Sequence, residues 1–195
     1  MTAEKKAISR FTVPQLAELP QDIRARIEEV SEKSGFIPNV FLVLARRPHE
    51  FRAFFAYHDA LMERESGLSK AEKEMIVVVT SAMNDCQYCV VAHGAILRIK
   101  ARNPLIADQI AINYLKADLS ECQVIMLKLA LKIASSSGEV TDADLDEART
   151  VGFDEEDLWD IGAITAFFAL SNRMANFSSM RPNDEFYDMG RNSPQ

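Results

Sequence analysis

The chain has 195 residues, of which 48% are hydrophobic and 26% are charged, the composition of a folded protein with one core. Its formal net charge is −7, and an acidic surface argues against nucleic acid or an anionic membrane as a partner. The N-terminal residues lack the apolar run of a secretory signal peptide, and no apolar stretch approaches the length of a membrane span. We therefore expect a cytoplasmic protein.

Helix signals follow one another along most of the chain. Residues 1–20 contain two prolines and are predicted to form an N-terminal arm. Over residues 21–182 apolar residues recur at helical spacing, and no segment alternates convincingly with the period of a strand beyond residues 77–80. We predict one all-α domain, a helical bundle of about eight to ten helices. Residues 183–195 are predicted to be a tail.

Two capping boxes mark helix starts sharply, an S-x-x-E beginning at Ser69 and an S-x-x-Q beginning at Ser120. Each serine follows a leucine, which hints at an internal helical duplication. The helix after the first box, residues 70–83, is apolar nearly all round, which predicts that it is buried. Its β-branched run alone would favour a strand, but the cap and the flanking helical pattern outweigh that signal.

A C-x-x-C motif opens the next predicted helix, over residues 86–101. An Asn-Asp pair directly before the motif is a helix-start signal, because both side chains accept bonds from free N–H groups. Cys86, Cys89 and His93 stand at i, i+3 and i+7, so they share one face of that helix. Three cysteines, two of them in such a motif, indicate redox use in a reducing compartment rather than a disulfide scaffold.

This arrangement predicts thiol chemistry. The thiolate is the reactive form, and a helix N-terminus and an adjacent histidine both lower the pKa of a cysteine from about 8.5. Two thiols in C-x-x-C can close into a disulfide, so that one attacks and the other resolves. His93 can take the thiol proton. Glu74 can hold the imidazole of His93 in the required tautomer, provided that the two helices pack closely enough.

Four residues at fixed spacing carry a resemblance to a known family: Glu74, Cys86, Cys89 and His93. Their pattern resembles the signature of the alkylhydroperoxidase-D-like branch of the carboxymuconolactone decarboxylase superfamily. The surrounding residues 68–94, LSKAEKEMIVVVTSAMNDCQYCVVAHG, are typical of that core. The similarity extends from about residue 37 to about residue 187 and is closest to the peroxidase-related subgroup. It implies the all-α fold of that branch.

The resemblance also implies roles. Cys89 would be the peroxidatic cysteine, Cys86 the resolving cysteine, and His93 with Glu74 the proton relay. The protein would be an antioxidant oxidoreductase with peroxiredoxin activity on hydroperoxides. It would hold no cofactor, depend on an external dithiol reductant, and assemble as a homo-oligomer, a trimer or hexamer. Family members carry a second histidine before the second cysteine, where this chain has Tyr88. A neutral phenol is a poor base near pH 7, which implies weak peroxidase activity or another oxidant.

Two further polar residues are candidates for the thiol pocket. His58 lies on the apolar stripe of a predicted helix, where a histidine is more often a satisfied core residue than a site residue. Asn172 lies on the apolar seam of the helix predicted over residues 158–177. The resemblance places that helix beside the cysteine helix, so that Asn172 is a candidate for the pocket, but hydrogen bonding within the core is the more common role of a buried amide.

Three alternatives to a thiol peroxidase remain open. The C-x-x-C motif can be half of a zinc site, with His93 and Glu74 as further ligands. The two thiols can also be buried and inert, in a non-catalytic structural oligomer. A lactone decarboxylase of the same superfamily would not need the cysteine pair.

Two further features of the sequence are the third cysteine and the apolar residues of the tail. Cys122 lies in the first turn of the helix that starts at Ser120, and we expect it to be a bystander. The tail carries Phe186, Tyr187 and Met189 among polar residues. Apolar residues on a polar tail predict that it docks on another surface, here expected to be a neighbouring subunit.

Overall fold

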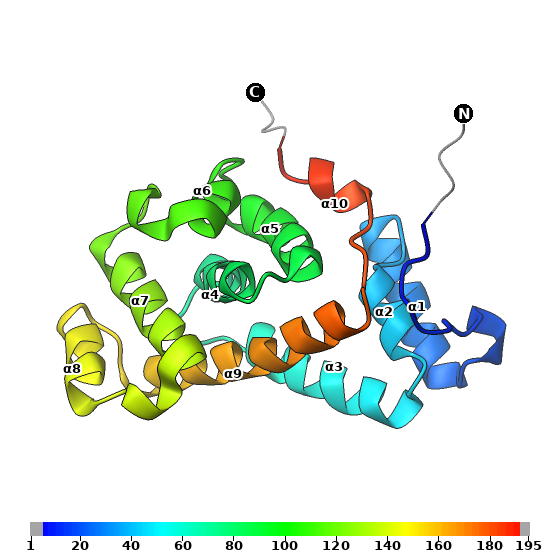
Figure 1. The fold of residues 1–195 in the computed structure, drawn as a ribbon, viewed down its shortest axis with the longest axis horizontal. Coiled ribbons are helices and arrows are strands. Elements are labelled where there is room, and N and C mark those ends of the chain that lie inside the picture. The colour runs from blue at the N-terminus through cyan, green and yellow to red at the C-terminus, as the bar shows by residue number, and fades with distance from the viewer. Residues whose placement is uncertain (1–5, 192–195) are drawn as a thin grey trace.

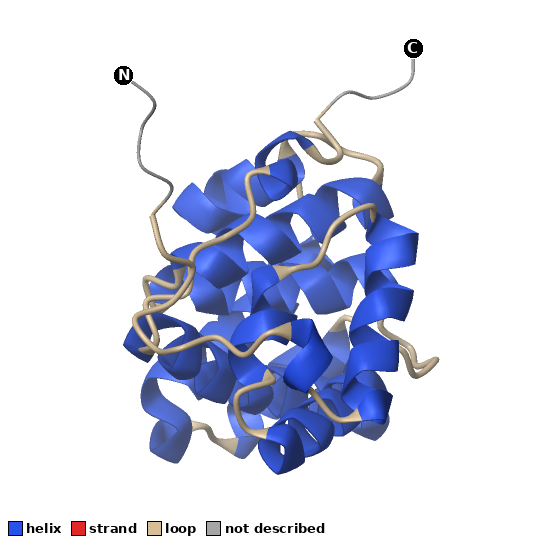
Figure 2. Ribbon diagram, turned by 90° about the vertical axis from the view of Figure 1, so that its right-hand side faces the viewer, coloured by secondary structure: helices blue, strands red, loops and turns tan. Residues whose placement is uncertain are grey.

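The computed structural model describes residues 6–191, so the first five residues of the predicted arm and the last four of the tail lie outside the described residues. The described chain is helical throughout, with no strand (Figure 2). The prediction of an all-α domain is confirmed. The α-helices are α1 (Gln21–Ser34), α2 (Asn39–Leu44), α3 (Pro48–Met62), α4 (Lys70–Met83), α5 (Gln87–Ala101), α6 (Ile106–Asn113), α7 (Glu121–Ser136), α8 (Asp142–Thr150), α9 (Glu155–Phe177) and α10 (Glu185–Asp188).

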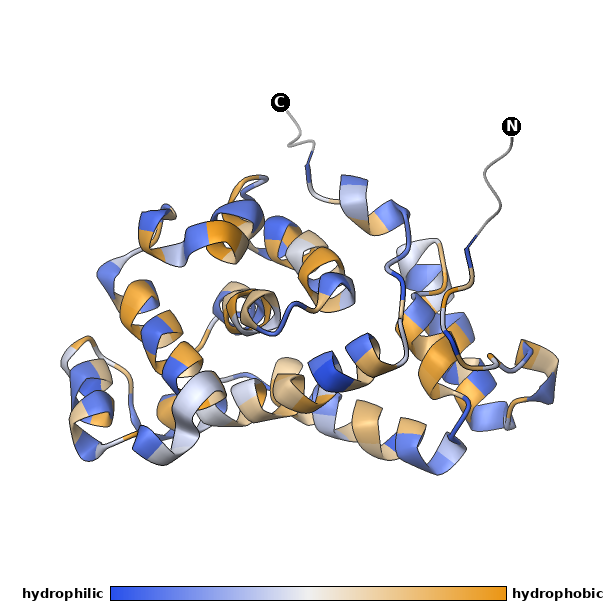
Figure 3. Cartoon of the chain, in the orientation of Figure 1, coloured by the Kyte–Doolittle hydropathy of each residue, from blue (hydrophilic) through white to orange (hydrophobic). Residues whose placement is uncertain are grey.

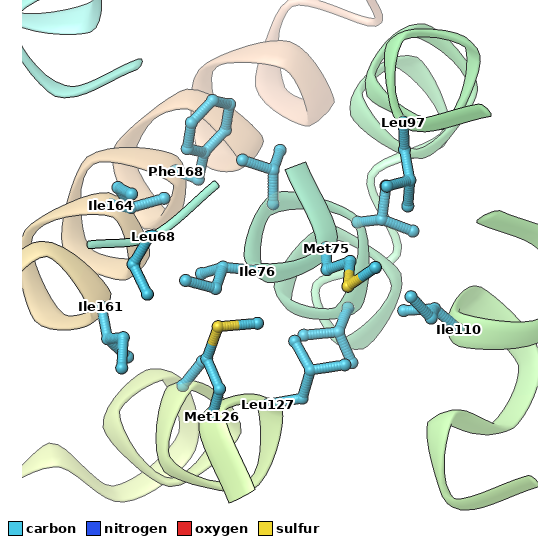
Figure 4. Packing of buried hydrophobic residues seen from close by; sticks show 14 of the residues in the cluster. Leu68, Met75, Ile76, Leu97, Ile110, Met126, Leu127, Ile161, Ile164 and Phe168 are labelled. Atoms are coloured by element: carbon cyan, nitrogen blue, oxygen red, sulfur yellow. The ribbon is translucent and has the colours of Figure 1, made fainter. Parts of the chain in front are cut away.

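Helix α4 is the centre of the fold. Figure 1 shows it end-on, enclosed by α5, α6, α7 and α9, and it packs against all four. Residues 73–81 of α4 are buried without interruption. Figure 4 shows Met75 and Ile76 of α4 among apolar side chains of the surrounding helices. Each of the surrounding helices carries both hydrophobic and hydrophilic residues along its length, as expected of helices with one buried face (Figure 3).

Both predicted capping boxes form. The backbone N–H of Glu72 donates to Ser69 Oγ at 3.2 Å, and the carboxylate of Glu72 accepts from the backbone N–H of Ser69 at 2.9 Å. Ser120 and Gln123 do the same at the start of α7. The β-branched run of α4 is helical, and Thr80 Oγ1 donates to the carbonyl of Ile76 at 2.7 Å, which satisfies its buried hydroxyl.

The turn between α4 and α5 differs in detail from the predicted start of α5. Asn84 ends α4 instead of starting α5, and its backbone N–H donates to the carbonyl of Thr80. Asp85 has a φ of 51°, a left-handed conformation that aspartate tolerates better than most residues. Cys86 takes the N-cap position of α5, and its own N–H donates to the carbonyl of Ser81 at 2.9 Å.

The two ends of the described chain close over the cysteine region. The backbone of Arg10 donates to Ser178 at 2.9 Å, and that of Arg181 donates to Ile8 at 3.1 Å. Ile8 and Met180 belong to the same apolar cluster as Cys86 and Cys89. The arm therefore forms part of the wall around the cysteines.

The described part of the tail docks on its own chain, against α5 and the apolar cluster around the cysteines. Arg98 of α5 is buried, and its guanidinium donates to the carbonyls of Met189 at 2.9 Å and Phe186 at 2.8 Å. Phe186 packs into the apolar cluster around the cysteines, edge-on to Phe36. The apolar residues of the tail do dock, as predicted, but they dock beside α5, and no local sequence pattern identifies that helix as their partner. None of the helices within residues 6–191 is long and apolar enough to cross a bilayer.

The central position of α4 predicts the cost of opening a cavity in it. Ile76 is fully buried, and we expect Ile76→Ala to lower the free energy of unfolding by about 2–5 kcal/mol, because it removes packed methylene groups and leaves a cavity. Ile112→Ala is the matched control, since Ile112 is 85% exposed and its loss should change stability little. Urea unfolding followed by circular dichroism measures both, and equal effects would contradict the central role of α4.

Candidate active site

The two cysteines of the motif lie together at the start of α5. Cys86 and Cys89 are both free thiols, and their exposed fractions are 0% and 2%. Their sulfur atoms lie 2.6 Å apart, and the backbone N–H of Cys89 donates to Cys86 Sγ at 3.4 Å. The two sulfurs are thus placed to form a disulfide when an oxidant removes two electrons from the pair.

The contact between the sulfurs makes the two thiols unequal. The S–H of Cys89 and its backbone N–H both stabilise a negative charge on Cys86, and together they lower the pKa of Cys86. The same sulfur–sulfur hydrogen bond, together with burial, raises the pKa of Cys89 well above its ordinary value. In the resting pair the charge is therefore favoured on Cys86, whereas the sequence assigns the attack to Cys89.

The predicted histidine–carboxylate pair is formed by two neighbouring helices. Nδ1 of His93 on α5 lies 2.8 Å from Oε2 of Glu74 on α4, and both side chains are largely buried. The carboxylate orients the ring, and with Nδ1 protonated it leaves Nε2 free to accept a proton. The edge of the ring packs against Phe168 of α9, with 4.8 Å between ring centroids. Within residues 6–191, His93 makes no hydrogen bond to either sulfur, but a positive charge on its ring, when protonated, lowers the pKa of Cys86.

Asn172 of α9 is fully buried beside the turn between α4 and α5. Its Nδ2 donates to Ser81 Oγ at 2.9 Å, and its Oδ1 accepts from Asn84 Nδ2 at 3.0 Å. The structure therefore places Asn172 at the cysteines, as the sequence analysis considered, and also gives it the hydrogen bonds of the simpler core interpretation. Ser81 and Asn84 were not predicted to have this contact.

Tyr88 is buried behind the motif. Its hydroxyl accepts a hydrogen bond from the backbone N–H of Val40 at 3.1 Å, and burial raises its pKa far above that of a free phenol. Tyr88 cannot act as a base at neutral pH, in agreement with the expectation from the sequence. Its role in the structure is to tie α2 to α5.

His58 of α3 lies further from the sulfurs. Its Nδ1 is 3.1 Å from Asp59 Oδ1, and Asp59 in turn accepts from Arg26 at 2.7 Å. The imidazole borders Phe168, the ring that also packs against His93. Burial lowers the pKa of His58, so the ring is neutral at pH 7. His58 belongs to the surroundings of the His93–Glu74 pair, not to the pocket of the thiols.

Two hollows of the surface lie near this region. One, of about 540 Å³, is bordered by Tyr88 and Asp85 beside the start of α5. The other, of about 690 Å³, is an apolar groove between α3 and α9. The sulfurs line neither hollow, so the thiols are enclosed. Within residues 6–191 no three His, Cys, Asp or Glu side chains gather as a metal site would require.

The model of the carboxymuconolactone decarboxylase family matches residues 48–104, which include the cysteines, His93 and Glu74. An alkylhydroperoxidase AhpD core, an uncharacterized peroxidase-related protein from Ralstonia eutropha JMP134, is 64% identical, with a TM-score of 0.96 over 97% of this chain and 100% of that one. The chain belongs to the alkylhydroperoxidase-D-like branch of the carboxymuconolactone decarboxylase family.

Other structures extend this alkylhydroperoxidase-D-like group. An uncharacterized peroxidase-related protein from Silicibacter sp. TM1040 is 38% identical, with a TM-score of 0.91 over 98% of this chain and 100% of that one. The debrominase Bmp8 is 20% identical, with a TM-score of 0.76 over 92% of this chain and 95% of that one, and shares the fold. No match was found among curated proteins.

In this alkylhydroperoxidase-D-like chain, His58 predicts a pH dependence of stability. Because burial lowers its pKa below 6.5, the unfolded chain binds more protons, so the contribution of His58 to stability is present above about pH 6.5 and is lost as pH falls. Between about pH 7.5 and about pH 5.5, we expect the free energy of unfolding to fall less in His58→Gln than in the wild type. His49→Gln, at an exposed site on the first turn of α3, is the control. Urea unfolding at both pH values measures this difference. A pH dependence of stability in His58→Gln equal to that of the wild type would contradict the assigned effect of His58.

Proposed function

We propose that the chain is a thiol-dependent peroxidase of antioxidant type, which reduces hydroperoxides through Cys86 and Cys89. The observation that carries this proposal is the 2.6 Å separation of two free, enclosed sulfurs on the helix that also presents His93, paired with Glu74, one turn further on. Two close relatives are peroxidase-related proteins, which supports the same kind of enzyme.

The proposed reaction has two oxidative steps. The thiolate attacks a hydroperoxide, forming an S–O bond while the O–O bond breaks, and the alkoxide leaves as an alcohol with a proton from the imidazolium of His93. The second thiol then attacks the sulfenic sulfur, forming the disulfide, while hydroxide leaves with a proton as water. An external dithiol is oxidised as it reduces the disulfide. No bound cofactor takes part.

Proton transfer to and from His93 needs a bridging group. His93 makes no hydrogen bond to either sulfur within the described residues, so we propose that the bound peroxide or a water molecule carries the proton between the sulfur and Nε2. Glu74 keeps Nε2 free to accept and stabilises the imidazolium that results. A carboxylate–imidazole pair of this kind contributes about 10²–10⁴-fold to a rate.

We assign the attack to Cys89 and the resolution to Cys86. At rest the charge is favoured on Cys86, so Cys89 must first give its proton to Cys86, across 2.6 Å. The assignment of the attack to Cys89 follows the resemblance, since both sulfurs are enclosed. The reductant is proposed to be a dithiol, and the protein is proposed to be a cytoplasmic homo-oligomer, as the resemblance implies.

Serine variants test both the cysteine pair and the order within it. We expect Cys86→Ser and Cys89→Ser each to abolish repeated peroxide turnover, because neither variant can form the disulfide. Cys122→Ser, which removes a half-buried thiol outside the pair, should keep full activity. Peroxide consumption with a dithiol reductant measures this, and full turnover by Cys89→Ser would exclude the proposed mechanism.

Dimedone labelling of the single variants after one addition of peroxide gives the order. We expect a sulfenic acid on Cys89 in Cys86→Ser and none on Cys86 in Cys89→Ser. The reverse result would show that the sulfur that is more acidic at rest is also the attacking one. Turnover of a carboxylated lactone by the double serine variant would favour the decarboxylase alternative.

The contact of Glu74 with His93 predicts that removal of the carboxylate lowers peroxide turnover. We expect Glu74→Gln to lower peroxide turnover by about 10²-fold, because an amide no longer stabilises the imidazolium of His93. Glu65→Gln, at an exposed site before α4, should leave turnover unchanged. Steady-state kinetics of both variants under the same conditions measure the difference, and turnover of Glu74→Gln within twofold of the wild type would remove Glu74 from the relay.

A further inference from the structure

The buried amide of Asn172 is more tightly constrained than core packing alone requires. Asn172 is 0% exposed, lies in the C-terminal third of α9, and is hydrogen-bonded to two residues of a different part of the chain, Ser81 and Asn84. Both of those residues adjoin the cysteines, since the backbone N–H of Cys86 donates to the carbonyl of Ser81 at 2.9 Å. The amide therefore lies directly over the turn that leads into the C-x-x-C motif.

The two partners fix which way the amide points. An asparagine has one acceptor oxygen and an NH₂ group with two donors. The side chain of Asn84 donates to Oδ1 of Asn172, which places the oxygen on the side of Asn84. The NH₂ group then faces Ser81, to which one N–H donates. The second N–H has no other hydrogen-bond partner within residues 6–191, and the Asn172 side chain is close enough to the sulfurs to lower the pKa of both cysteines.

An enclosed thiolate needs hydrogen-bond donors, because burial without them disfavours the charge. The side chains that lower the pKa of Cys89 are Asn172 and Ser171, both on α9. Tyr88 is occupied with Val40, and His93 makes no hydrogen bond to a sulfur within the described residues. The donors to Cys86 from α5 are the S–H and N–H groups of Cys89. When Cys89 carries the charge, the shared proton is on Cys86, whose S–H then donates to Cys89, and the amide of Asn172 on α9 is a second group that favours the charge.

We propose that Asn172 is a catalytic residue whose free N–H donates to whichever sulfur carries the negative charge, with Asn84 and Ser81 holding the amide in that orientation. The role concerns the same cysteine pair and so rests on the proposed function. It explains why a polar side chain occupies the apolar seam of α9. It also makes α9 a part of the reaction site rather than only a wall of it.

The test is the acidity of the thiols, which is measured without any peroxide. Thiolate absorbance near 240 nm is followed during a pH titration of the reduced protein, in a Cys122→Ser background so that only the pair is observed. We expect Asn172→Ala to raise the pKa of the more acidic thiol by about one, which lowers the thiolate fraction near neutral pH about tenfold. Asn172→Asp keeps the shape but replaces the donor with a charge, and should raise that pKa further.

Asn176→Ala is the matched control. Asn176 is the same residue type one turn further along α9, and its side chain also bonds to Asn84, through the backbone carbonyl at 2.9 Å. It should leave the thiol pKa unchanged. Asn84→Ala frees the oxygen of Asn172 and should give an intermediate rise. Melting temperatures of all variants identify any that fail to fold. If an Asn172 variant is unfolded, the thiol pKa of Asn84→Ala is used in its place to test the proposal.

The outcomes separate this inference from the proposed function. A higher thiol pKa in Asn172→Ala but not in Asn176→Ala supports the role of Asn172, even if the wild type turns over no peroxide. An equal thiol pKa in the wild type and the folded Asn172 variants overturns it, even if the wild type is an active peroxidase. Loss of peroxide turnover with unchanged thiol pKa would likewise make Asn172 a structural residue.

Discussion

The structure depends on the burial of α4 by the helices around it. A helix enclosed on every side can present polar groups only where another helix supplies a partner, because an unpaired buried polar group costs free energy. Glu74 faces α5 and bonds to His93, while Ser81 and Asn84, at the other end of the helix, face α9 and bond to Asn172. The candidate site is thus built from the polar exceptions of an otherwise apolar central helix.

The enclosure of the cysteines accounts for the unequal thiols. In water two neighbouring thiols would be solvated separately, whereas here Cys86 and Cys89 are each other's main polar contact. A proton shared between them stabilises one charge and suppresses the other, so the pair titrates as a unit. This favours the ionisation of one thiol while the other keeps its proton, with the second thiol beside the first and placed to form a disulfide once the first is oxidised.

The helices could be predicted from the sequence because their signals are local. The capping box at Ser69 gives the start of α4, and the limits of residues 70–83 match the helix found. The site was only partly predictable. Helical spacing brings Cys86, Cys89 and His93 to one face, but the contact of His93 with Glu74 depends on how α4 packs on α5.

The sequence did not show whether Asn84 starts one helix or ends another. Its short amide favours the start of a helix, but in the fold it ends α4 and orients Asn172. The acidity of the thiols was also beyond prediction, because it depends on the distance between two sulfurs and not on their spacing in the chain. For the same reason the partner of the tail, Arg98 on α5, could be found only in the structure.

The closure of the arm and the tail over the cysteine cluster has a consequence for synthesis of the protein. A ribosome releases Cys86 and Cys89 long before Met180 and Phe186, which complete the cluster around them. Until then, both thiols of the nascent chain lie open to oxidants and to foreign cysteines. The thiols therefore acquire their protected setting only after Met180 and Phe186 have been added to the chain.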